Sequence, residues 1–474
     1  MSTTRRVALV TGAVVVAGVV CVPEALAHGI VGRADLPIPV WLFGWAAALV
    51  LVVSFVALAV LWPEPRLEQA RRRRLFRVPV AVDAVCGALG VALFGLVVYA
   101  GLAGTQSATA NLAPRFVYVF FWVGLVVASA LFGDVFRLFN PWRATARAVA
   151  WAAAHVTPRG LPAPIPYPDR LGRWPAVAGL FAFGWLELVY PSPGREMPST
   201  LATLALIYAA AQFVGMSLYG IERWSQRGDA FSVYFGLFAR LSVFERRDGT
   251  LFLRPPLAGV TGLERLPGTV ALLSVMIGVT AFDGAAEGGL WNSAGPGLQD
   301  FFVARGASLE LGLEIAFTIG LVAAVLIVAG VYRIGVLGVH TVSRERSTAD
   351  LSALFVHTLV PIALAYVVAH YFSLLVFEGQ AVSFLASDPL GDGSDYLGTA
   401  GTAIDYSVIS ATTIWYGQVA ALVIGHVCGL MLAHDRALTV FRDPRLATRS
   451  QYWMLVVMVA FTSLGLWLLS VSNQ

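Results

Sequence analysis

Residues 39–62 read PVWLFGWAAALVLVVSFVALAVLW, a run without a single charged side chain. A helix needs about 20 apolar residues to cross the hydrocarbon core of a bilayer. Because lipid cannot hydrogen-bond to an open backbone, a run of this kind has to be helical. The stretch therefore predicts a membrane-spanning helix.

Further stretches along the chain have the same apolar character and length. They are 79–103, 115–137, 174–191, 200–221, 267–285, 311–332, 352–377, 407–433 and 452–471. The stretch 174–191 is the shortest, and its Glu187 and closing Pro191 also allow a re-entrant segment. The sequence therefore predicts an all-α fold, a polytopic transmembrane bundle of about ten spans.

The composition excludes the other broad classes of protein. Hydrophobic residues make up 58% of the chain and charged residues 13%, and the mean hydropathy is +0.75. Soluble domains carry about 25% charged residues, so a soluble enzyme, a disordered chain and a fibrous repeat are all excluded. The 32 basic residues, all of them Arg, face 28 acidic residues.

The Arg residues are unevenly distributed between the predicted loops. After residue 27, only Arg33, Arg115, Arg195 and Arg305 fall on one side of the predicted bundle. Cytoplasmic loops are enriched in basic residues, so the other side is predicted to be cytoplasmic and both mature termini extracytoplasmic. The predicted cytoplasmic segments are 63–78, 138–173, 222–266, 333–351 and 434–451. A basic membrane face accounts for the positive charge, and we expect no nucleic-acid partner.

Residues 1–27 are typical of a secretory signal peptide. Arg5 and Arg6 precede an apolar run, and Ala25-Leu26-Ala27 supplies a small-x-small cleavage pattern. The alternative is an uncleaved first transmembrane helix. Cleavage would leave residues 28–474 as a single integral membrane domain, multi-pass in the cell membrane, beginning at His28.

An amino-terminal His28 would offer an α-amine and an imidazole nitrogen from one residue. This pair suits copper or another late first-row ion. The alternative is that His28 merely follows a permissive cleavage site, because one residue cannot complete a metal site.

Ionisable side chains inside predicted spans form two candidate clusters. Such a group costs about 2.5–3.5 kcal/mol on insertion scales, so its presence requires a reason. The cluster in the outer half consists of Glu187, Asp283, Glu287, Glu310, Glu314, His370 and Glu378, with His28 near them. The cluster in the inner half consists of Asp83, Cys86, Asp134, His357, His426 and His434. His and carboxylate groups at one depth suit a divalent metal or a proton relay, whereas any single carboxylate can equally be a capping residue that faces water.

Several familiar catalytic motifs are absent from the sequence. It contains no Gly-Lys-Ser phosphate loop, no His-Glu-x-x-His, no Cys-x-x-Cys-His and no Gly-x-Ser-x-Gly. Nucleotide-driven transport, zincin proteolysis, c-type haem attachment and ordinary esterase chemistry are therefore not supported.

Short segments along the whole chain resemble a bacterial membrane-protein family commonly labelled fenitrothion hydrolase. They are Ala27-His28-Gly29-Ile30, Asp35-Leu36-Pro37-Ile38-Pro39, Trp41-Leu42-Phe43, Phe139-Asn140-Pro141-Trp142, Phe282-Asp283-Gly284, Ala369-His370-Tyr371-Phe372 and Phe377-Glu378-Gly379. The resemblance implies a membrane-bound phosphotriesterase that splits organophosphate P–O bonds and takes a small apolar substrate from the lipid or the outer face.

The resemblance and the outer cluster together suggest roles for five residues. His28, Asp283 and His370 are the candidate ligands of a divalent metal, copper or zinc, which would activate water and polarise the phosphoryl oxygen. Glu314 is a further ligand or a catalytic carboxylate, and Glu187 is a catalytic base or a group that supports the ligands.

Two other classes of function remain open from the sequence. Intramembrane carboxylates and His also occur in proton-coupled transporters, and they would suit a copper- or metal-handling membrane protein. The third possibility is an accessory subunit of an envelope complex, in which the polar groups only join helices.

Overall fold

The computed structural model describes residues 40–156, 161–342, 344–441 and 443–471. In this part of the chain, nine helical segments are long and apolar enough to cross a membrane. They are Gly44–Leu61, Val80–Ala103, Leu112–Phe132, Pro198–Tyr219, Thr269–Ala286, Leu309–Val342, Thr348–Ser387, Ala411–Phe441 and Pro444–Trp467. The prediction of an all-α polytopic bundle is confirmed, and the protein is an integral membrane protein.

The tenth predicted span, 174–191, is the shorter helix α8 (Trp174–Leu188). Its 15 residues reach about 22 Å at about 1.5 Å per residue, which is less than the thickness of the hydrocarbon core. This helix ends before Pro191, a residue that cannot continue the hydrogen-bond ladder. Length alone therefore does not make α8 a complete span.

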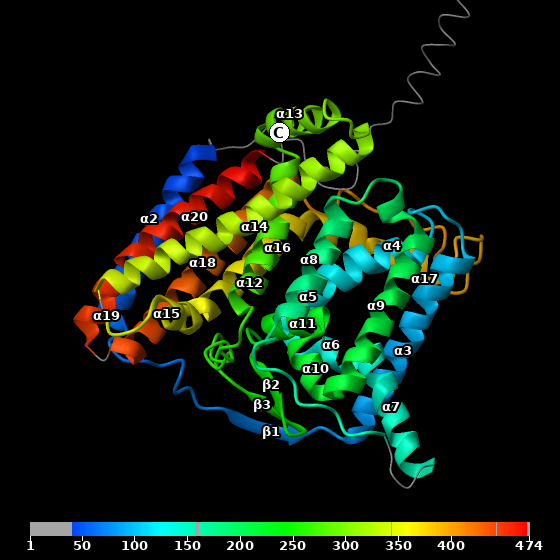
Figure 1. The fold of residues 1–474 in the computed structure, drawn as a ribbon, viewed down its shortest axis with the longest axis horizontal. Helices are drawn as coiled ribbons and strands as arrows, with labels where there is room; N and C mark the ends of the chain where they lie inside the picture. The colour runs from blue at the N-terminus through cyan, green and yellow to red at the C-terminus, as the bar shows by residue number, and fades with distance from the viewer. Residues whose placement is uncertain (1–39, 157–160, 343, 442, 472–474) are drawn as a thin grey trace, which may run out of the picture.

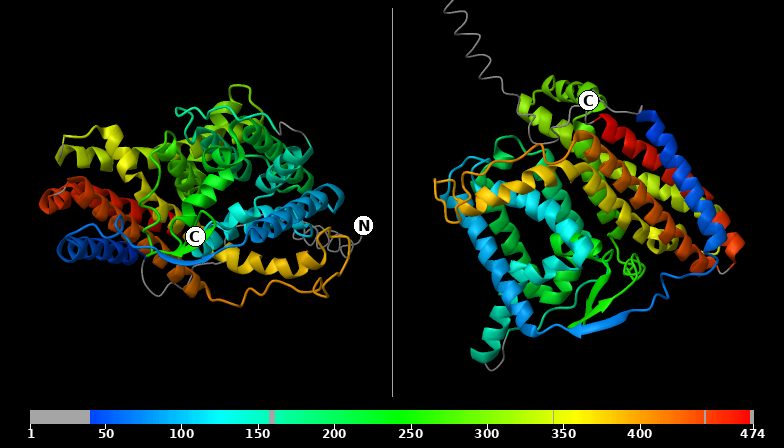
Figure 2. Two further views of the ribbon diagram at one scale, coloured as in Figure 1. Left: turned by 90° about the horizontal axis from the view of Figure 1, so that it is seen from below. Right: turned by 180° about the vertical axis from the view of Figure 1, so that it is seen from behind.

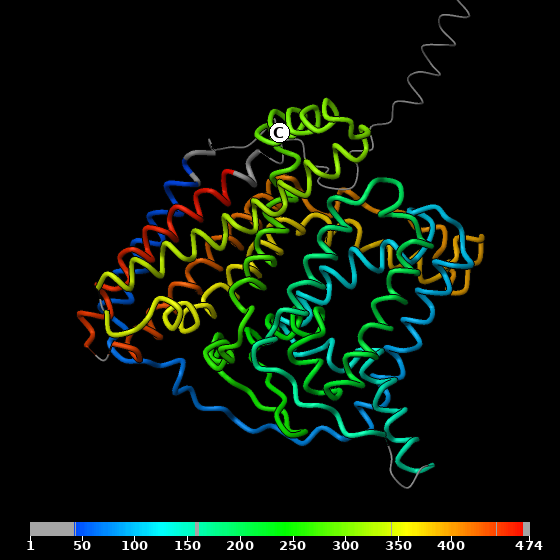
Figure 3. Tube along the Cα trace, in the orientation of Figure 1, coloured from blue at the N-terminus to red at the C-terminus, as the bar shows by residue number. Residues whose placement is uncertain are grey.

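The long helices lie in two groups, which Figure 1 shows on the left and the right of the molecule. The first helix group contains α2 (Val40–Leu61), α14 (Leu309–Val342), α18 (Ala411–Phe441) and α20 (Tyr452–Val471), with the short α15 (Thr348–Phe355) and α19 (Pro444–Ser450). The second helix group contains α3 (Val80–Ala103), α4 (Leu112–Arg115), α5 (Leu125–Phe132), α6 (Val135–Phe139), α7 (Pro141–Val156), α9 (Pro198–Tyr219) and α10 (Ile221–Arg227). The first and last described helices, α2 and α20, pack side by side (Figure 3).

The two groups meet along a central seam. It is formed by α8, α12 (Thr269–Ala286), α16 (Leu359–Glu378) and the π-helix η1 (Phe116–Gly124). Helix α12 packs against α8, α14 and α16, and α16 also packs against η1 and α18. Residues of the seam are therefore held by both helix groups.

Different elements mark the two ends of the bundle. Helix α13 (Gly289–Val303) lies across one end, the α13 end, and a three-stranded sheet lies at the opposite end, the sheet end (Figures 1 and 2). The sheet contains β1 (Arg73–Arg77), β2 (Phe244–Arg247) and β3 (Thr250–Leu253) in the antiparallel order β1-β3-β2. The remaining short helices are η2 (Gly194–Glu196), η3 (Val356–Thr358), η4 (Gly379–Ala381) and α17 (Val382–Ser387).

The stretch 222–266, predicted as a cytoplasmic segment, contains a buried helix as well as the hairpin of the sheet. Helix α11 (Ala230–Ala239) follows α10 and is buried along most of its length. Its Tyr234 stacks on Trp122 of η1, with ring centroids 4.7 Å apart and an interplanar angle of 12°. With only ten residues, α11 is too short to be recognised as a span.

The buried carboxylate of Asp229 fixes the start of α11. Its Oδ2 accepts hydrogen bonds from Trp142 Nε1 at 2.7 Å and from Asn140 Nδ2 at 3.2 Å. Its Oδ1 accepts one from the Tyr208 hydroxyl at 2.7 Å, and its side chain also caps the helix at Ser232 N. The Asn-Pro-Trp segment at 140–142 is therefore a structural connection between α7, α9 and α11.

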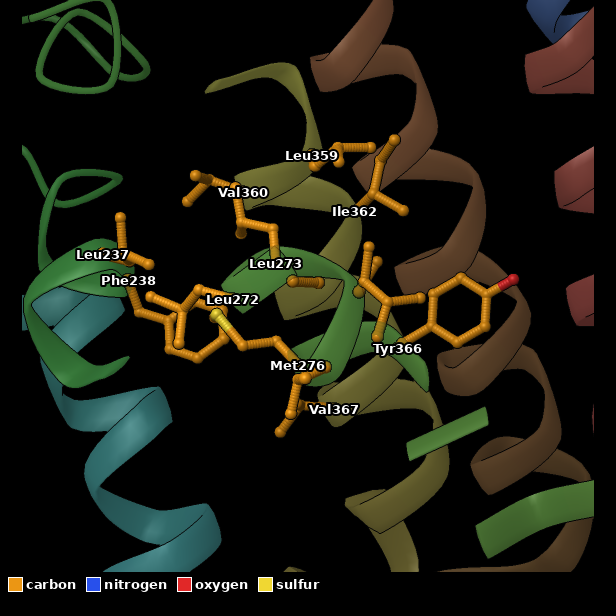
Figure 4. Close-up of a cluster of buried hydrophobic side chains, with 14 of the residues drawn as sticks. Leu237, Phe238, Leu272, Leu273, Met276, Leu359, Val360, Ile362, Tyr366 and Val367 are labelled. Atoms are coloured by element: carbon orange, nitrogen blue, oxygen red, sulfur yellow. The ribbon is translucent and has the colours of Figure 1, made fainter. Parts of the chain in front are cut away.

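Towards the sheet end, the seam is filled by apolar side chains. Leu272, Leu273 and Met276 of α12 lie between side chains of α11 and α16, as Figure 4 shows. Leu272 and Leu273 are fully buried, so this part of the seam excludes water. The one charged residue of α12, Asp283, lies closer to the α13 end.

Candidate functional site

Asp283 lies within the last turn of α12 and connects this helix to α16. Its carboxylate oxygen Oδ2 lies 2.8 Å from His370 Nε2, and the same oxygen accepts a hydrogen bond of 2.8 Å from the Tyr371 hydroxyl. An ionised carboxylate can only accept, so His370 carries its proton on Nε2 in this arrangement. The Nδ1 atom is therefore the ring nitrogen that remains for chemistry.

The two partners differ in their access to the surroundings. The side chain of His370 is 14% exposed, whereas that of Asp283 is 6% exposed. Gly284 lies beside the imidazole, and a Cβ atom at this position would lie 3.4 Å from His370 Nδ1. Glycine thus leaves Nδ1 uncrowded by a side chain from α12. The buried carboxylate of Asp283 therefore orients the imidazole of His370, which is the more exposed of the two.

Glu187 adds a second carboxylate from the end of α8. Its charge interacts with that of Asp283, and the hydroxyl of Tyr371 lies beside it. The Oε2 atom of Glu187 is buried and has no hydrogen-bond partner in the described part of the chain. Two carboxylates from different helices therefore lie near one Tyr hydroxyl. We name Glu187, Asp283, His370 and Tyr371 the Asp283 cluster.

Aromatic side chains of η1 and α11 border this cluster. The indole of Trp122 lies beside Tyr371, and it stacks on Tyr234. Segments of π-helix are rare and occur frequently at functional sites. An ion pair of 2.7 Å between Arg115 and Glu378 holds the start of η1 against the end of α16.

The structure does not place every predicted site residue in the cluster. Glu314 is half-buried on α14, and within the described ranges its carboxylate forms no hydrogen bond or ion pair with the Asp283 cluster. His28, and the whole proposed signal peptide at 1–27, lie outside the described residues. Of the five residues selected from the sequence, Asp283, His370 and Glu187 are brought together.

Of the other predicted outer carboxylates, Glu287 lies close enough to Asp283 and His370 for their charges to interact. Glu378 and two residues of the inner cluster have separate surroundings. Glu378 pairs with Arg115, and Asp83 forms two hydrogen bonds with Arg246, of 2.6 and 2.8 Å, at the sheet end. His434 Nε2 lies 2.9 Å from the carbonyl oxygen of Trp62. Asp83 and His434 therefore serve local contacts.

Sequence reasoning missed the aromatic members of the site. Tyr371 directly follows His370, and a search for hydrogen-bonding groups beside each buried His would have found it. Trp122 and Tyr234 carry no such signal, because aromatic residues are common in apolar helices. The contact of Tyr234 also depends on α11, which the sequence placed in a loop.

The donor types of the cluster are compatible with a divalent metal, but the described residues do not complete a site for one. Zinc and copper accept imidazole nitrogen and carboxylate oxygen. In the residues that the structure describes, no group of three His, Cys, Asp or Glu side chains is placed to hold an ion. We therefore assign no chemical step to a metal, and copper or zinc binding stays a prediction.

The fold and the site define a class: an all-α polytopic membrane protein with a buried Asp-His-Tyr-Glu cluster between two helix groups. Comparison with family models, curated proteins and solved structures finds no match for this chain. The function therefore has to be argued from the cluster itself.

Proposed function

We propose that the protein is a membrane-embedded hydrolase in which His370 is the general base. The hydrogen bond between His370 Nε2 and Asp283 is the observation that carries this proposal. A buried carboxylate that orients an accessible imidazole fixes its tautomer and stabilises the imidazolium that forms when the base accepts a proton. In such a pair the carboxylate is the more deeply buried group, as Asp283 is here relative to His370.

The proposed reaction is attack of water on a phosphotriester. Nδ1 of His370 removes a proton from water as its oxygen bonds to phosphorus, and the P–O bond to the leaving group breaks. The imidazolium then returns the proton to the departing oxygen, so atoms and charge balance. The substrate class comes from the family resemblance.

Turnover by membranes that contain the protein tests this proposal. A general base contributes about 10²–10⁴-fold to the rate, so we expect His370→Ala to lower hydrolysis of a paraoxon-type triester by at least about 100-fold. His155→Ala, on the exposed α7, is the matched control and should retain the wild-type rate. The proposal would be excluded if His370→Ala hydrolysed the triester at the wild-type rate. It would also be excluded if the wild-type protein hydrolysed neither phosphotriesters nor carboxyl esters.

A proton-coupled carrier is the second candidate, and the position of Glu187 favours it. Glu187 and Asp283 lie on different helices at the seam between the two helix groups, where relative movement of the groups would change their surroundings. Transporters commonly place coupling residues at such junctions.

Proton flux into liposomes that contain the protein, followed with an internal pH dye under an imposed membrane potential, tests the carrier. A carrier predicts a flux above that of empty liposomes, abolished in Glu187→Gln because the amide cannot bind and release a proton. Glu310→Gln, at an exposed position of α14, is the control and should leave the flux unchanged. Wild-type liposomes without excess flux would argue against the carrier.

A further inference from the structure

The strand β1 presents an exposed row of Arg side chains at the sheet end. Its sequence is RRLFR, and all five residues are exposed. It is an edge strand, paired on one side with β3. Figure 1 shows it lying across this end of the bundle, between α2 and α3.

Most of this positive charge has no acidic partner in the part of the chain that the structure describes. Arg72 pairs with Glu245 of β2 at 2.6 Å, and Arg246 pairs with Asp83. Across the described ranges, no ion pair is formed by the four remaining Arg of this strand and its approach, which are Arg71, Arg73, Arg74 and Arg77. The sheet end thus has an excess of exposed cations that the described residues do not neutralise.

Exposed apolar side chains occur within the strand and on α7, which reaches the same end of the molecule (Figure 1). Phe76 of β1 is 59% exposed, and Trp151 of α7, at the same end of the molecule, is 67% exposed. Arg beside Phe and Trp is typical of segments that lie in the interface of a membrane. A site for nucleic acid or for an acidic protein would not explain why this surface adjoins a membrane-spanning helix.

The chain itself places β1 close to the hydrocarbon. The strand ends at Arg77 and the spanning helix α3 begins at Val80, three residues later. Three extended residues cover about 10 Å, which is about one Debye length at physiological salt. Arg77 is therefore within electrostatic reach of the lipid headgroups around α3, and the other Arg residues precede it along the exposed strand.

We propose that the exposed Arg side chains of β1 and its approach bind the phosphate groups of anionic phospholipids. The unpaired guanidinium groups would contact lipid phosphate, and Phe76 and Trp151 would lie at the level of the headgroups. Each Arg near an anionic surface contributes about a fivefold preference for it. The surface is separate from the Asp283 cluster, so this inference does not depend on the proposed function.

The test measures lipid selectivity in nanodiscs that contain equal amounts of phosphatidylglycerol and phosphatidylcholine. The lipids retained by the purified protein are quantified by native mass spectrometry. The test variant carries Arg→Gln at four positions: Arg71, Arg73, Arg74 and Arg77. We expect its preference for phosphatidylglycerol to be at least about fivefold lower than that of the wild type.

A matched control distinguishes the effect of this surface from the effect of removing four positive charges elsewhere on the protein. It carries the same four-charge change at exposed positions outside the sheet: Arg344, Arg346, Arg445 and Arg449. The control Arg residues also lie beside spanning helices, so the control should lose some of the preference, but clearly less than the test variant. Both variants should unfold at the wild-type temperature in phosphatidylcholine alone. An equal loss in the control would overturn the proposal. A test variant that aggregates but keeps its lipid preference would also overturn the proposal. The Arg side chains would then serve only to prevent the edge strand from pairing with another chain.

Discussion

Asp283→Asn is expected to lower substrate turnover by about 10²–10⁴-fold while the bundle remains folded. The amide has the shape of the carboxylate, so the helices should still pack. An amide oxygen at the Oδ2 position can still accept from His370 and Tyr371, but it carries no charge to stabilise the imidazolium. If the amide nitrogen faces the imidazole, Nε2 becomes the acceptor and the proton moves to Nδ1. In both arrangements His370 is a poorer base.

Tyr371→Phe is the control for this substitution, because it removes the other hydrogen bond to the same carboxylate oxygen. The imidazole keeps its charged partner in this variant, so we expect a loss of about tenfold or less, which corresponds to the roughly 0.5–1.5 kcal/mol net contribution of a typical hydrogen bond. Steady-state rates of triester hydrolysis, measured together with thermal unfolding in detergent, distinguish the two. Equal losses in the two variants would mean that Asp283 acts only as a helix-to-helix contact.

The membrane-spanning part of the fold follows from the length of the apolar runs. Lipid leaves the backbone no alternative to a helix, so a run such as 39–62 determines its own structure without any knowledge of its neighbours. The same argument identified Asp283, His370 and Glu187, because ionisable groups within such runs are costly. It could not separate these residues from Glu314, since the rotation of each helix about its axis is set by packing.

The sheet and α11 depend on contacts that an apolar-run search does not detect. The turn between β2 and β3 is Asp248-Gly249, both with positive φ, and this dipeptide is a recognised hairpin signal. Its partner β1 lies about 170 residues earlier in the chain, so no local pattern indicates the pairing. Helix α11 is stabilised by the hydrogen bonds that Asp229 accepts. The donors of these bonds lie on α7, directly before α7 and on α9.

Asp229→Ala is expected to lower the free energy of unfolding by about 3–5 kcal/mol. The buried donors Trp142 Nε1, Asn140 Nδ2 and the Tyr208 hydroxyl would lose the same acceptor group at once. Each buried polar group left without a partner costs about 1–3 kcal/mol. Denaturation of the purified protein in mild detergent, followed by tryptophan fluorescence, measures the change.

Asp443→Ala is the matched control, because Asp443 also caps a helix, α19, but is exposed. Its side chain accepts from Arg445 N at 2.9 Å, and its loss should cost only about 1 kcal/mol, the usual value of a helix cap. The difference between the two variants isolates the buried hydrogen bonds from the capping effect. If Asp229→Ala were no more destabilising than Asp443→Ala, the bonds from Asn140, Trp142 and Tyr208 would contribute nothing, and α11 would be held in place by its apolar packing alone.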